Sequence, residues 1–308
     1  MKSKPKKILI IGIGSMGTSH FNSFINSKSD YDIYLCDKKI NQLKKNINNL
    51  IIKKKLYFLS KVPKNHKFDL AIISTNSKER LKILKYLLKF NLVKNLILEK
   101  FLFNKINYYS QCEDILKNKK IQNVNVNSWG NSIFKKLNFK LNGNFTASYY
   151  LRKNGLGSNL IHISDLFSSL IKNEDFDIKG LNLIKVKSKR RKGYNEITGR
   201  IILKSKIGLL RIHDTSKTKY HTLKIKDEKN SFVLQLNNKK KCYFFKNKKL
   251  IKTFNFPFAK DTTEKIFLKF INNKTMMKND FNNYYNISLL SKKIILFIKS
   301  KFKNFNLT

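Results

Sequence analysis

Residues 8–17 read Ile-Leu-Ile-Ile-Gly-Ile-Gly-Ser-Met-Gly, so an apolar run passes directly into a G-x-G-x-x-G pattern. We interpret the stretch as a buried strand, a tight turn and the beginning of a helix. Gly12 permits the turn that leaves the strand, Gly14 lets the backbone approach a ligand closely, and Gly17 lets the helix pack near the strand. Glycine turns are common, so the surrounding sequence decides what this pattern means.

The residues after the pattern have the spacing of a helix. Apolar side chains recur at helical intervals over residues 15–26. Backbone N–H groups at Ser15 and Met16 would begin this helix, where the helix dipole favours negative charge. The stretch therefore predicts a strand–turn–helix unit that binds the pyrophosphate of a dinucleotide.

An acidic residue stands at the position that such a unit requires. A second strand over residues 31–36 ends at Asp37, twenty residues past Gly17. A carboxylate there accepts hydrogen bonds from both ribose hydroxyls of adenosine and repels a 2′-phosphate, so Asp37 favours NAD. The adjacent Lys38 and Lys39 leave NADP open as a cofactor. An ordinary turn residue is the alternative interpretation of Asp37.

Strands and helices alternate as far as residue 126, which predicts a doubly wound parallel sheet of the Rossmann type. The expected strands after the first two lie at 56–59, 69–74, 95–98 and 121–126, with helices at 40–50, 77–90 and 104–118 between them. We therefore expect an α/β dinucleotide-binding domain over residues 1–126.

Residues 127–308 have a different pattern. A strand at 145–151 and an apolar helix at 159–171 precede strands at 177–186, 197–204, 208–213, 220–225 and 232–236. Consecutive strands without helices between them imply a mostly antiparallel sheet. Two helices, near 261–272 and 284–301, close the chain. We therefore expect a C-terminal α+β domain with a mostly antiparallel sheet over residues 127–308.

The formal net charge of +46 raises the question of a nucleic-acid partner. Only six of the 65 basic residues are arginine, the side chain that makes bidentate contacts to phosphates and bases. The lysines are spread along the whole chain together with many Asn, Ile and Phe residues, as AT-rich coding would produce. We expect no specific nucleic-acid partner, although a polyanion-binding protein stays a rival hypothesis.

The cysteines and the apolar segments indicate the compartment. Cys36, Cys112 and Cys242 are widely separated, which suggests neither a disulfide framework nor a metal site, and His213 and His221 lack partners at metal-ligand spacing. The apolar run after the basic start breaks at Gly12, and no apolar span of about 18 residues follows. We expect a cytoplasmic protein without membrane insertion and without a metal.

Four motifs in this order resemble the Gfo/Idh/MocA oxidoreductases. They are the glycine pattern, Ile-Ser-Thr-Asn at 73–76, Glu-Lys at 99–100, and Gly-Leu-Gly-Ser-Asn-Leu-Ile-His-Ile-Ser-Asp at 155–165. The resemblance implies a Rossmann domain joined to an α+β domain, and NAD(P)-dependent oxidation or reduction of a CH–OH carbon in a sugar or cyclitol. It also implies a homo-oligomer formed through the open sheet face. The wording of the motifs resembles a branch found with bacterial surface-polysaccharide or nonulosonic-acid sugar genes.

The resemblance assigns a catalytic role to Lys100. This residue matches the lysine of the family's Glu-Lys-Pro motif, where an ammonium group hydrogen-bonds the reacting oxygen and stabilises developing negative charge. The chain has Phe101 where the family usually has proline, so a rigid turn is not guaranteed. In so lysine-rich a chain, a plain surface lysine is the alternative.

The resemblance assigns a second catalytic role to His162, as proton acceptor or substrate ligand. A core histidine on an apolar helix is the alternative. Many family members have Asp four residues earlier, where this chain has Ser158, followed by Asn159. Neither side chain replaces a carboxylate as the charge partner of an imidazolium. His162 then works with a substrate group or water, or the chemistry runs mainly through Lys100. Asp165 could partner His162 or simply pack.

Further coenzyme contacts are expected at the carboxyl ends of the strands. Thr75 and Asn76 follow the strand at 69–74, and Glu99 precedes Lys100 in the family motif. Thr75 or Asn76 could equally cap the next helix, and the two roles are compatible. We interpret His20, within the first helix, as a packing residue. The substrate contacts expected from the resemblance are Lys100, Ser158, Asn159 and His162.

The sequence thus favours an NAD(P)-dependent dehydrogenase or reductase whose substrate is a sugar, including a nucleotide-activated or acidic sugar. The alternative within the same fold is a sensor or scaffold that binds the dinucleotide but has weakened catalysis, which the Ser158 departure allows.

Overall fold

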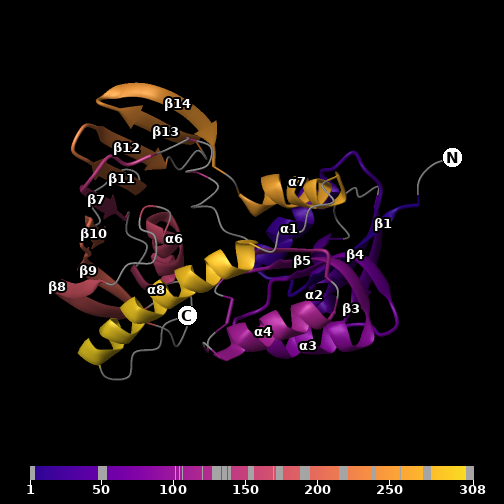
Figure 1. Ribbon diagram of the computed structural model, residues 1–308. Coiled ribbons are helices and arrows are strands. Elements are labelled where there is room, and N and C mark those ends of the chain that lie inside the picture. The colour runs from indigo at the N-terminus through magenta and orange to yellow at the C-terminus, as the bar shows by residue number, and fades with distance from the viewer. Residues whose placement is uncertain are drawn as a thin grey trace. The chain divides into compact units, whose positions relative to one another are not determined.

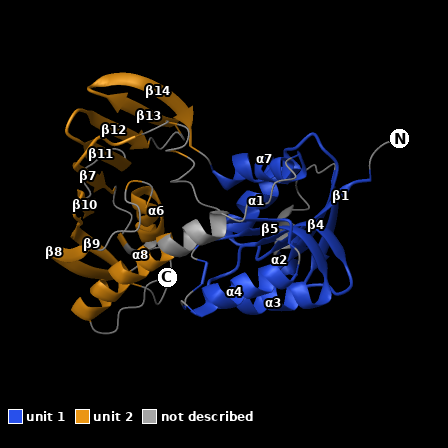
Figure 2. Cartoon of the chain, in the orientation of Figure 1, with its two compact units in different colours: residues 1–127, 258–285 blue, residues 128–257, 286–308 orange. Residues whose placement is uncertain are grey.

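The computed structural model describes residues 4–47, 54–100, 102–103, 105, 107–119, 121–126, 133, 137, 140–151, 156–168, 170, 176–187, 195–214, 221–236, 241–256, 258–272 and 279–302 (Figure 1). The chain divides into two compact units (Figure 2). The first comprises residues 1–127 and 258–285, and the second comprises 128–257 and 286–308. This division differs from two consecutive segments, because residues 258–285 return to the first unit.

The first unit is built on a six-stranded parallel sheet, as predicted. Its order is β3-β2-β1-β4-β5-β6. The strands are β1 (Lys6–Ile11), β2 (Tyr31–Cys36), β3 (Lys55–Leu59), β4 (Lys67–Ile73), β5 (Leu92–Leu98) and β6 (Asn123–Val126). The order reverses between β1 and β4, and ligands of doubly wound sheets bind at the carboxyl ends of the strands at such a switch point.

Helices lie on both faces of this sheet. They are α1 (Ser15–Ile25), α2 (Ile40–Ile47), α3 (Arg80–Phe90) and α4 (Asn107–Asn118). Helix α3 buries Leu81, Leu84, Leu87 and Leu88, whose spacing of three and four residues places them on one side of the helix. Helices α3 and α4 cover one face of the sheet, and α1 lies on the other (Figure 1). The doubly wound arrangement is therefore confirmed.

A helix from late in the chain completes the first unit. Helix α7 (Ala259–Asn272) packs beside α1 (Figure 1). Phe267 is fully buried, and its ring meets that of Phe24 edge-on at 6.2 Å between centroids. Side chains of α1 also accept hydrogen bonds from the backbone of α7: the Lys260 N–H donates to Ser19 Oγ (3.1 Å) and the Glu264 N–H donates to Ser23 Oγ (3.0 Å). These apolar and polar contacts explain why α7 belongs to the first unit.

The second unit is built on an eight-stranded, mostly antiparallel sheet, which confirms the predicted fold class. Its order is β14-β13-β12-β11-β7-β10-β9-β8, and β7 with β10 is its parallel pair. The strands are β7 (Phe145–Tyr150), β8 (Asp177–Lys187), β9 (Asn195–Lys204), β10 (Gly208–Asp214), β11 (His221–Lys226), β12 (Ser231–Leu236), β13 (Lys241–Lys246) and β14 (Lys249–Asn255). Helix α6 (Leu156–Ser168) and the end of α8 (Asn279–Lys301) share a core with alternate strand residues.

The β13–β14 hairpin is absent from the sequence-based expectation. Its two turn residues, Asn247 and Lys248, have φ values of 47° and 67°. Two positive φ values are typical of a type I′ hairpin turn, which sequences usually announce with Asn-Gly or Asp-Gly. Here lysine takes the glycine position, and most side chains of β14 are exposed, so no apolar alternation marks the strand.

Among the described residues, no helix is both long and apolar enough to cross a membrane.

Replacing Phe267 by alanine tests the role of α7. Loss of this fully buried ring should cost the first unit about 3–5 kcal/mol of unfolding free energy. Leu268→Ala, on the same helix but 37% exposed, is the matched control and should change stability little. Calorimetry with segment-resolved hydrogen exchange measures both variants. Equal losses would show that α7 is not packed on the first unit through Phe267.

Candidate functional site

Gly12 forms the turn at the end of β1. Its φ is +87°, a conformation that L side chains rarely adopt. A Cβ at this position would lie 2.8 Å from Thr75 Cγ2 and 2.9 Å from the Thr75 nitrogen. The Gly12 N–H donates to the carbonyl of Cys36 (2.8 Å), at the end of β2. The turn thus joins the ends of β1 and β2 and the residue after β4, and only glycine fits it.

Gly17 lies where α1 passes over that turn. A Cβ on Gly17 would be 2.0 Å from the Gly12 oxygen and 3.0 Å from Ser74 Oγ. The Ser74 hydroxyl donates to this same Gly12 carbonyl (2.7 Å). The first turn of α1 is therefore in backbone contact with the turn after β1, as the pattern predicted for its third glycine.

Gly14 lies on the opposite, open side of the loop. Apart from Gly14 itself, its two chain neighbours and the nearby backbone of α1, no heavy atom of the described residues comes within 4 Å of the position that its Cβ would take. Gly14 is the N-cap residue of α1, no side chain within the described ranges caps this helix, and its first turn has no acidic residue. The first N–H groups of a helix have no intrahelical acceptor. The first-turn amides of Ser15 and Met16 therefore face a space suited to an anion, and Gly14 adds no side chain to fill it.

The structure brings Asp37 against the glycine loop. The Ile13 N–H donates to Asp37 Oδ2 (2.8 Å), and the Lys39 N–H donates to Oδ1 (2.9 Å). Each carboxylate oxygen keeps a further acceptor position, and the side chain is half-exposed. Asp37 can therefore accept hydrogen bonds from a ribose while it is held in place by the loop.

Thr75 and Asn76 have different surroundings. Thr75 is in contact distance of the Gly12 turn, and its hydroxyl is buried without a hydrogen-bond partner among the described residues. Asn76 is exposed, and its Oδ1 accepts the Glu79 N–H (3.1 Å) at the turn before α3. Asn76 thus holds the turn before α3, whose N-cap residue is Glu79, and is not itself the cap of the helix. The unsatisfied Thr75 hydroxyl, the Gly14 space and Asp37 together fit the phosphate and ribose groups of a dinucleotide.

Burial keeps the neighbouring thiol protonated. Cys36 ends β2 beside Asp37, and burial, with the nearby Asp37 charge, raises the pKa of its thiol to about 12. Cys36 therefore acts as an apolar side chain at neutral pH, not as a nucleophile.

Glu99 is enclosed rather than open to solvent. It is 2% exposed, and its Oε1 lies 2.9 Å from His20 Nε2. The other ring nitrogen, His20 Nδ1, lies 2.7 Å from the hydroxyl of Thr263 in α7. A direct contact between the Glu99 carboxylate and a coenzyme stays a prediction. His20 is buried as expected, yet it also bridges α7 and Glu99 by hydrogen bonds.

Arg80, at the beginning of α3, is a site residue that sequence reasoning missed. It is 2% exposed, and its guanidinium donates to the carbonyls of Thr75, Glu99 and Leu102, the last at 2.9 Å. These carbonyls follow the ends of β4 and β5. The available signal was its residue type, because an arginine is unusual in a chain whose cations are almost all lysine.

Lys100 directly follows β5 and Glu99 at the carboxyl edge of the sheet, and it is half-buried. It thus lies at the same edge of the sheet as the glycine loop. The residue before it, Glu99, is held by hydrogen bonds. Phe101, which stands in place of the family proline, lies outside the described residues.

The second unit holds the other predicted catalytic residues on α6. Asn159 and His162 are half-buried, whereas Asp165 is 2% exposed. Ser158 belongs to α6, but its side chain lies outside the described part of the chain. Lys100 and His162 belong to different units, and each is described within its own unit.

Within the described ranges, no group of three His, Cys, Asp or Glu residues could hold a metal ion.

His213 lies in β10 of the second unit. Burial, and then the charges of Arg200 and Arg211, lower the pKa of His213. Its ring stacks on Tyr150 at 4.7 Å between centroids. His213 is therefore neutral at physiological pH and packs against its neighbour strand.

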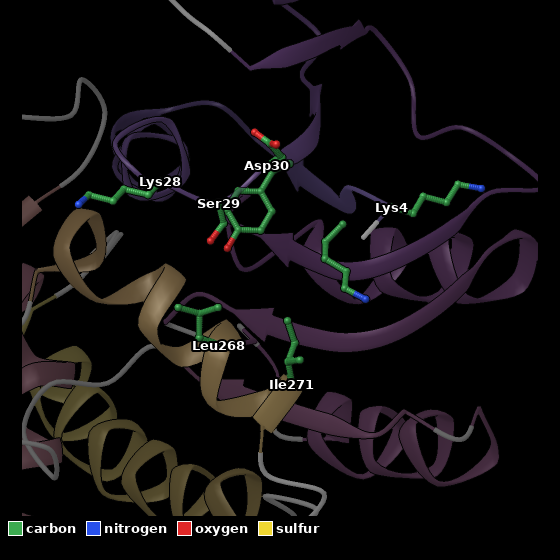
Figure 3. Close-up of a pocket in the computed structure, with 8 residues that line it drawn as sticks. Lys4, Lys28, Ser29, Asp30, Leu268 and Ile271 are labelled. Atoms are coloured by element: carbon green, nitrogen blue, oxygen red, sulfur yellow. The ribbon is translucent and has the colours of Figure 1, made fainter. Parts of the chain in front are cut away.

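One cavity of the first unit lies apart from the candidate site. It has a volume of about 460 Å³ and lies at the amino ends of β1 and β2, beside α7 (Figure 3). Its lining includes Lys4, Lys28, Asp30, Leu268 and Ile271. Gly12, Asp37 and Thr75 lie at the carboxyl ends of the strands, so this cavity belongs to the other edge of the sheet.

Comparison with known proteins extends the fold assignment. The sequence matches no family model and no curated protein sequence. The structure is similar to that of the dehydrogenase MviM from Clostridium difficile (TM-score 0.69, 16% identity, 95% of this chain and 99% of that chain). It is also similar to the UDP-N-acetylglucosamine 3-dehydrogenase GnnA from Acidithiobacillus ferrooxidans (TM-score 0.68, 10% identity, 96% and 98%). A third similar structure is the super-repressor mutant of Gal80p from Saccharomyces cerevisiae (TM-score 0.66, 12% identity, 96% of each chain). At such identities the likeness shows a shared two-domain fold.

Substitution by alanine should have different effects at Gly17 and at Gly14. Gly17→Ala places a methyl group 2.0 Å from a backbone oxygen and should strongly destabilise the first unit. Gly14→Ala meets open space at an ordinary φ of −76° and should leave the thermal unfolding midpoint unchanged. Thermal unfolding of both variants measures this. A stable Gly17→Ala variant would contradict the close contact of α1 with the turn.

Proposed function

We propose that this protein is an NAD(P)-dependent oxidoreductase that transfers a hydride to or from a CH–OH carbon of a sugar or sugar derivative. The observation that carries the proposal is the convergence of the Gly14 space, the Asp37 carboxylate and the Thr75 hydroxyl at the switch point of the sheet. In this proposal NAD is preferred, because Asp37 disfavours a 2′-phosphate.

Each residue has a defined task in the proposed reaction. The bound nicotinamide supplies hydride chemistry at its C4 carbon. The first-turn amides of α1 bind the pyrophosphate, and Asp37 binds the adenosine ribose. The Lys100 ammonium donates a hydrogen bond to the substrate oxygen and stabilises its negative charge. His162 accepts or returns the proton, with a substrate group or water as its partner.

Two observations support a sugar as the substrate class. The ordered motifs resemble a family that acts on sugars and cyclitols, and GnnA, which shares the fold, is a UDP-N-acetylglucosamine dehydrogenase. The high positive charge would attract a phosphorylated or carboxylated substrate by long-range electrostatics. We therefore propose a nucleotide-activated or acidic sugar, as used in surface-polysaccharide synthesis. A cytoplasmic homo-oligomer, joined through the sheet of the second unit, completes the proposal.

A second candidate function is a dinucleotide-binding sensor or scaffold with weakened catalysis. Ser158 stands where many family members have the carboxylate that supports the histidine. A super-repressor mutant of Gal80p, a protein from Saccharomyces cerevisiae, has a similar structure. Tight NADH binding without hydride transfer to any sugar of a broad panel would favour this candidate.

Titration with NADH and NADPH, followed by protein fluorescence and energy transfer to the nicotinamide, tests the coenzyme assignment. NADH should bind ahead of NADPH. Gly14→Ala should fold normally yet lose about tenfold or more in NADH affinity, because its methyl group occupies the coenzyme space. If the wild-type protein binds neither NADH nor NADPH, the result contradicts the proposal.

Lys100→Met removes the proposed hydrogen-bond donor and keeps a side chain of similar length. Turnover should fall by about 10²–10⁴-fold, while NADH affinity stays close to that of the wild type. Lys105→Met, in the same unit, is the control and should leave turnover unchanged. Unaltered turnover in the Lys100→Met variant would remove this residue from the mechanism.

A further inference from the structure

All three functional groups of Glu99 are engaged in the first unit. Its N–H donates to the Ile73 carbonyl (3.1 Å), its carbonyl accepts from Arg80, and its carboxylate is 2.9 Å from His20 Nε2. A residue held at its nitrogen, its carbonyl and its side chain has little freedom to move. The backbone of Lys100 begins at this fixed point.

The guanidinium of Arg80 donates hydrogen bonds to carbonyls that precede and follow Lys100 in the chain. The same nitrogen, Nη1, donates to the carbonyl of Glu99, before Lys100, and to the carbonyl of Leu102, after it (2.9 Å). The second nitrogen, Nη2, donates to the Thr75 carbonyl beside the glycine turn. One side chain therefore links Glu99 and Leu102, on either side of Lys100 in the chain, to Thr75 beside the glycine turn.

The contacts at position 80 favour an arginine over a lysine. A buried cation is costly unless hydrogen bonds replace its lost hydration. Arg80 is 2% exposed and has carbonyl acceptors from three residues, which suits the planar fork of a guanidinium and not the single ammonium of lysine. In a chain where biased coding makes lysine the usual cation, this geometry explains an arginine at the beginning of α3.

His20 holds the other side of Glu99, because both of its ring nitrogens have a partner. Nε2 lies 2.9 Å from the Glu99 carboxylate, and Nδ1 lies 2.7 Å from the Thr263 hydroxyl, which is also 2.7 Å from the Ala259 carbonyl. His20 and Glu99 are 1% and 2% exposed, so no solvent competes for their hydrogen bond.

We propose that Arg80 and His20 are positioning residues that hold Lys100 in its working place at the coenzyme edge of the sheet. This inference rests on the proposed function for the role of Lys100, although the positioning itself can be tested without a substrate. The resemblance expects proline at position 101, where the chain has phenylalanine. The Arg80 hydrogen bonds restrain Glu99 and Leu102, the described residues on either side of this position.

Competitive labelling of lysines with a trace of acetic anhydride over a pH series, read by mass spectrometry, tests the proposal. The method reports the reactivity of Lys100 separately from that of Lys94 and Lys105 in the same unit. Arg80→Lys keeps the charge but not the fork, and His20→Gln keeps one hydrogen bond but not both. Each variant should change the pH profile of Lys100 labelling and leave the profiles of Lys94 and Lys105 unchanged.

Asn91→Leu is the matched control for a general loss of stability. Asn91 is 8% exposed and donates to the carbonyls of Pro63 (2.9 Å) and Leu87 (3.1 Å), away from Lys100. This variant should leave the Lys100 profile as in the wild type. If Arg80→Lys fails to fold, Thr263→Val, which removes the hydrogen-bond partner of His20 Nδ1, should shift the Lys100 profile in the same way.

An unchanged Lys100 profile in the folded Arg80 and His20 variants would overturn the proposal, and so would an equal change in Asn91→Leu. Once a substrate is known, the same variants should lose about 10-fold to 10²-fold in kcat with little change in NADH affinity. Absence of NADH binding in the wild type would refute the proposed function but would leave the labelling result to decide the positioning of Lys100.

Discussion

The contact between Gly17 and the Gly12 carbonyl sets how closely α1 can approach the turn after β1, where the coenzyme loop lies. A single methyl group on Gly17 would come within 2.0 Å of that oxygen, so α1 can approach the sheet only if this residue is glycine. The contact places the amino end of α1 over the carboxyl end of β1. It also leaves Gly14 on the outside of the loop, facing the space that suits a pyrophosphate.

The second feature of the unit is a buried polar path between segments far apart in the sequence. Thr263, His20 and Glu99 are joined by hydrogen bonds, and Thr263 is 243 residues from His20. Arg80 extends the path to the carbonyls of Thr75 and Leu102. Buried polar groups must find partners, so a fixed set of hydrogen bonds specifies one arrangement of α7, α1 and the strand ends.

Local patterns allowed the fold class and the coenzyme loop to be predicted. The glycines, the strand before them and Asp37 lie within thirty residues, and their geometry depends on backbone sterics close in sequence. The contacts of His20 and Arg80 could not be predicted in this way, because their partners are distant in the chain or are backbone carbonyls. The packing of α7 on α1 could not be predicted for a related reason, because the pattern of an amphipathic helix does not encode which element it will cover. The β13–β14 hairpin could not be predicted, because Lys248 adopts a positive φ that glycine usually takes in such a turn, so no glycine marks the turn in the sequence.

A crystal structure of the protein with NAD bound tests the central claim most directly. The account predicts the pyrophosphate against the first-turn amides of α1 beside Gly14, with the adenosine ribose on the Asp37 carboxylate. A dinucleotide bound elsewhere, for instance in the cavity lined by Lys4 and Lys28, or a first-turn space left without coenzyme at saturating NAD, would contradict it.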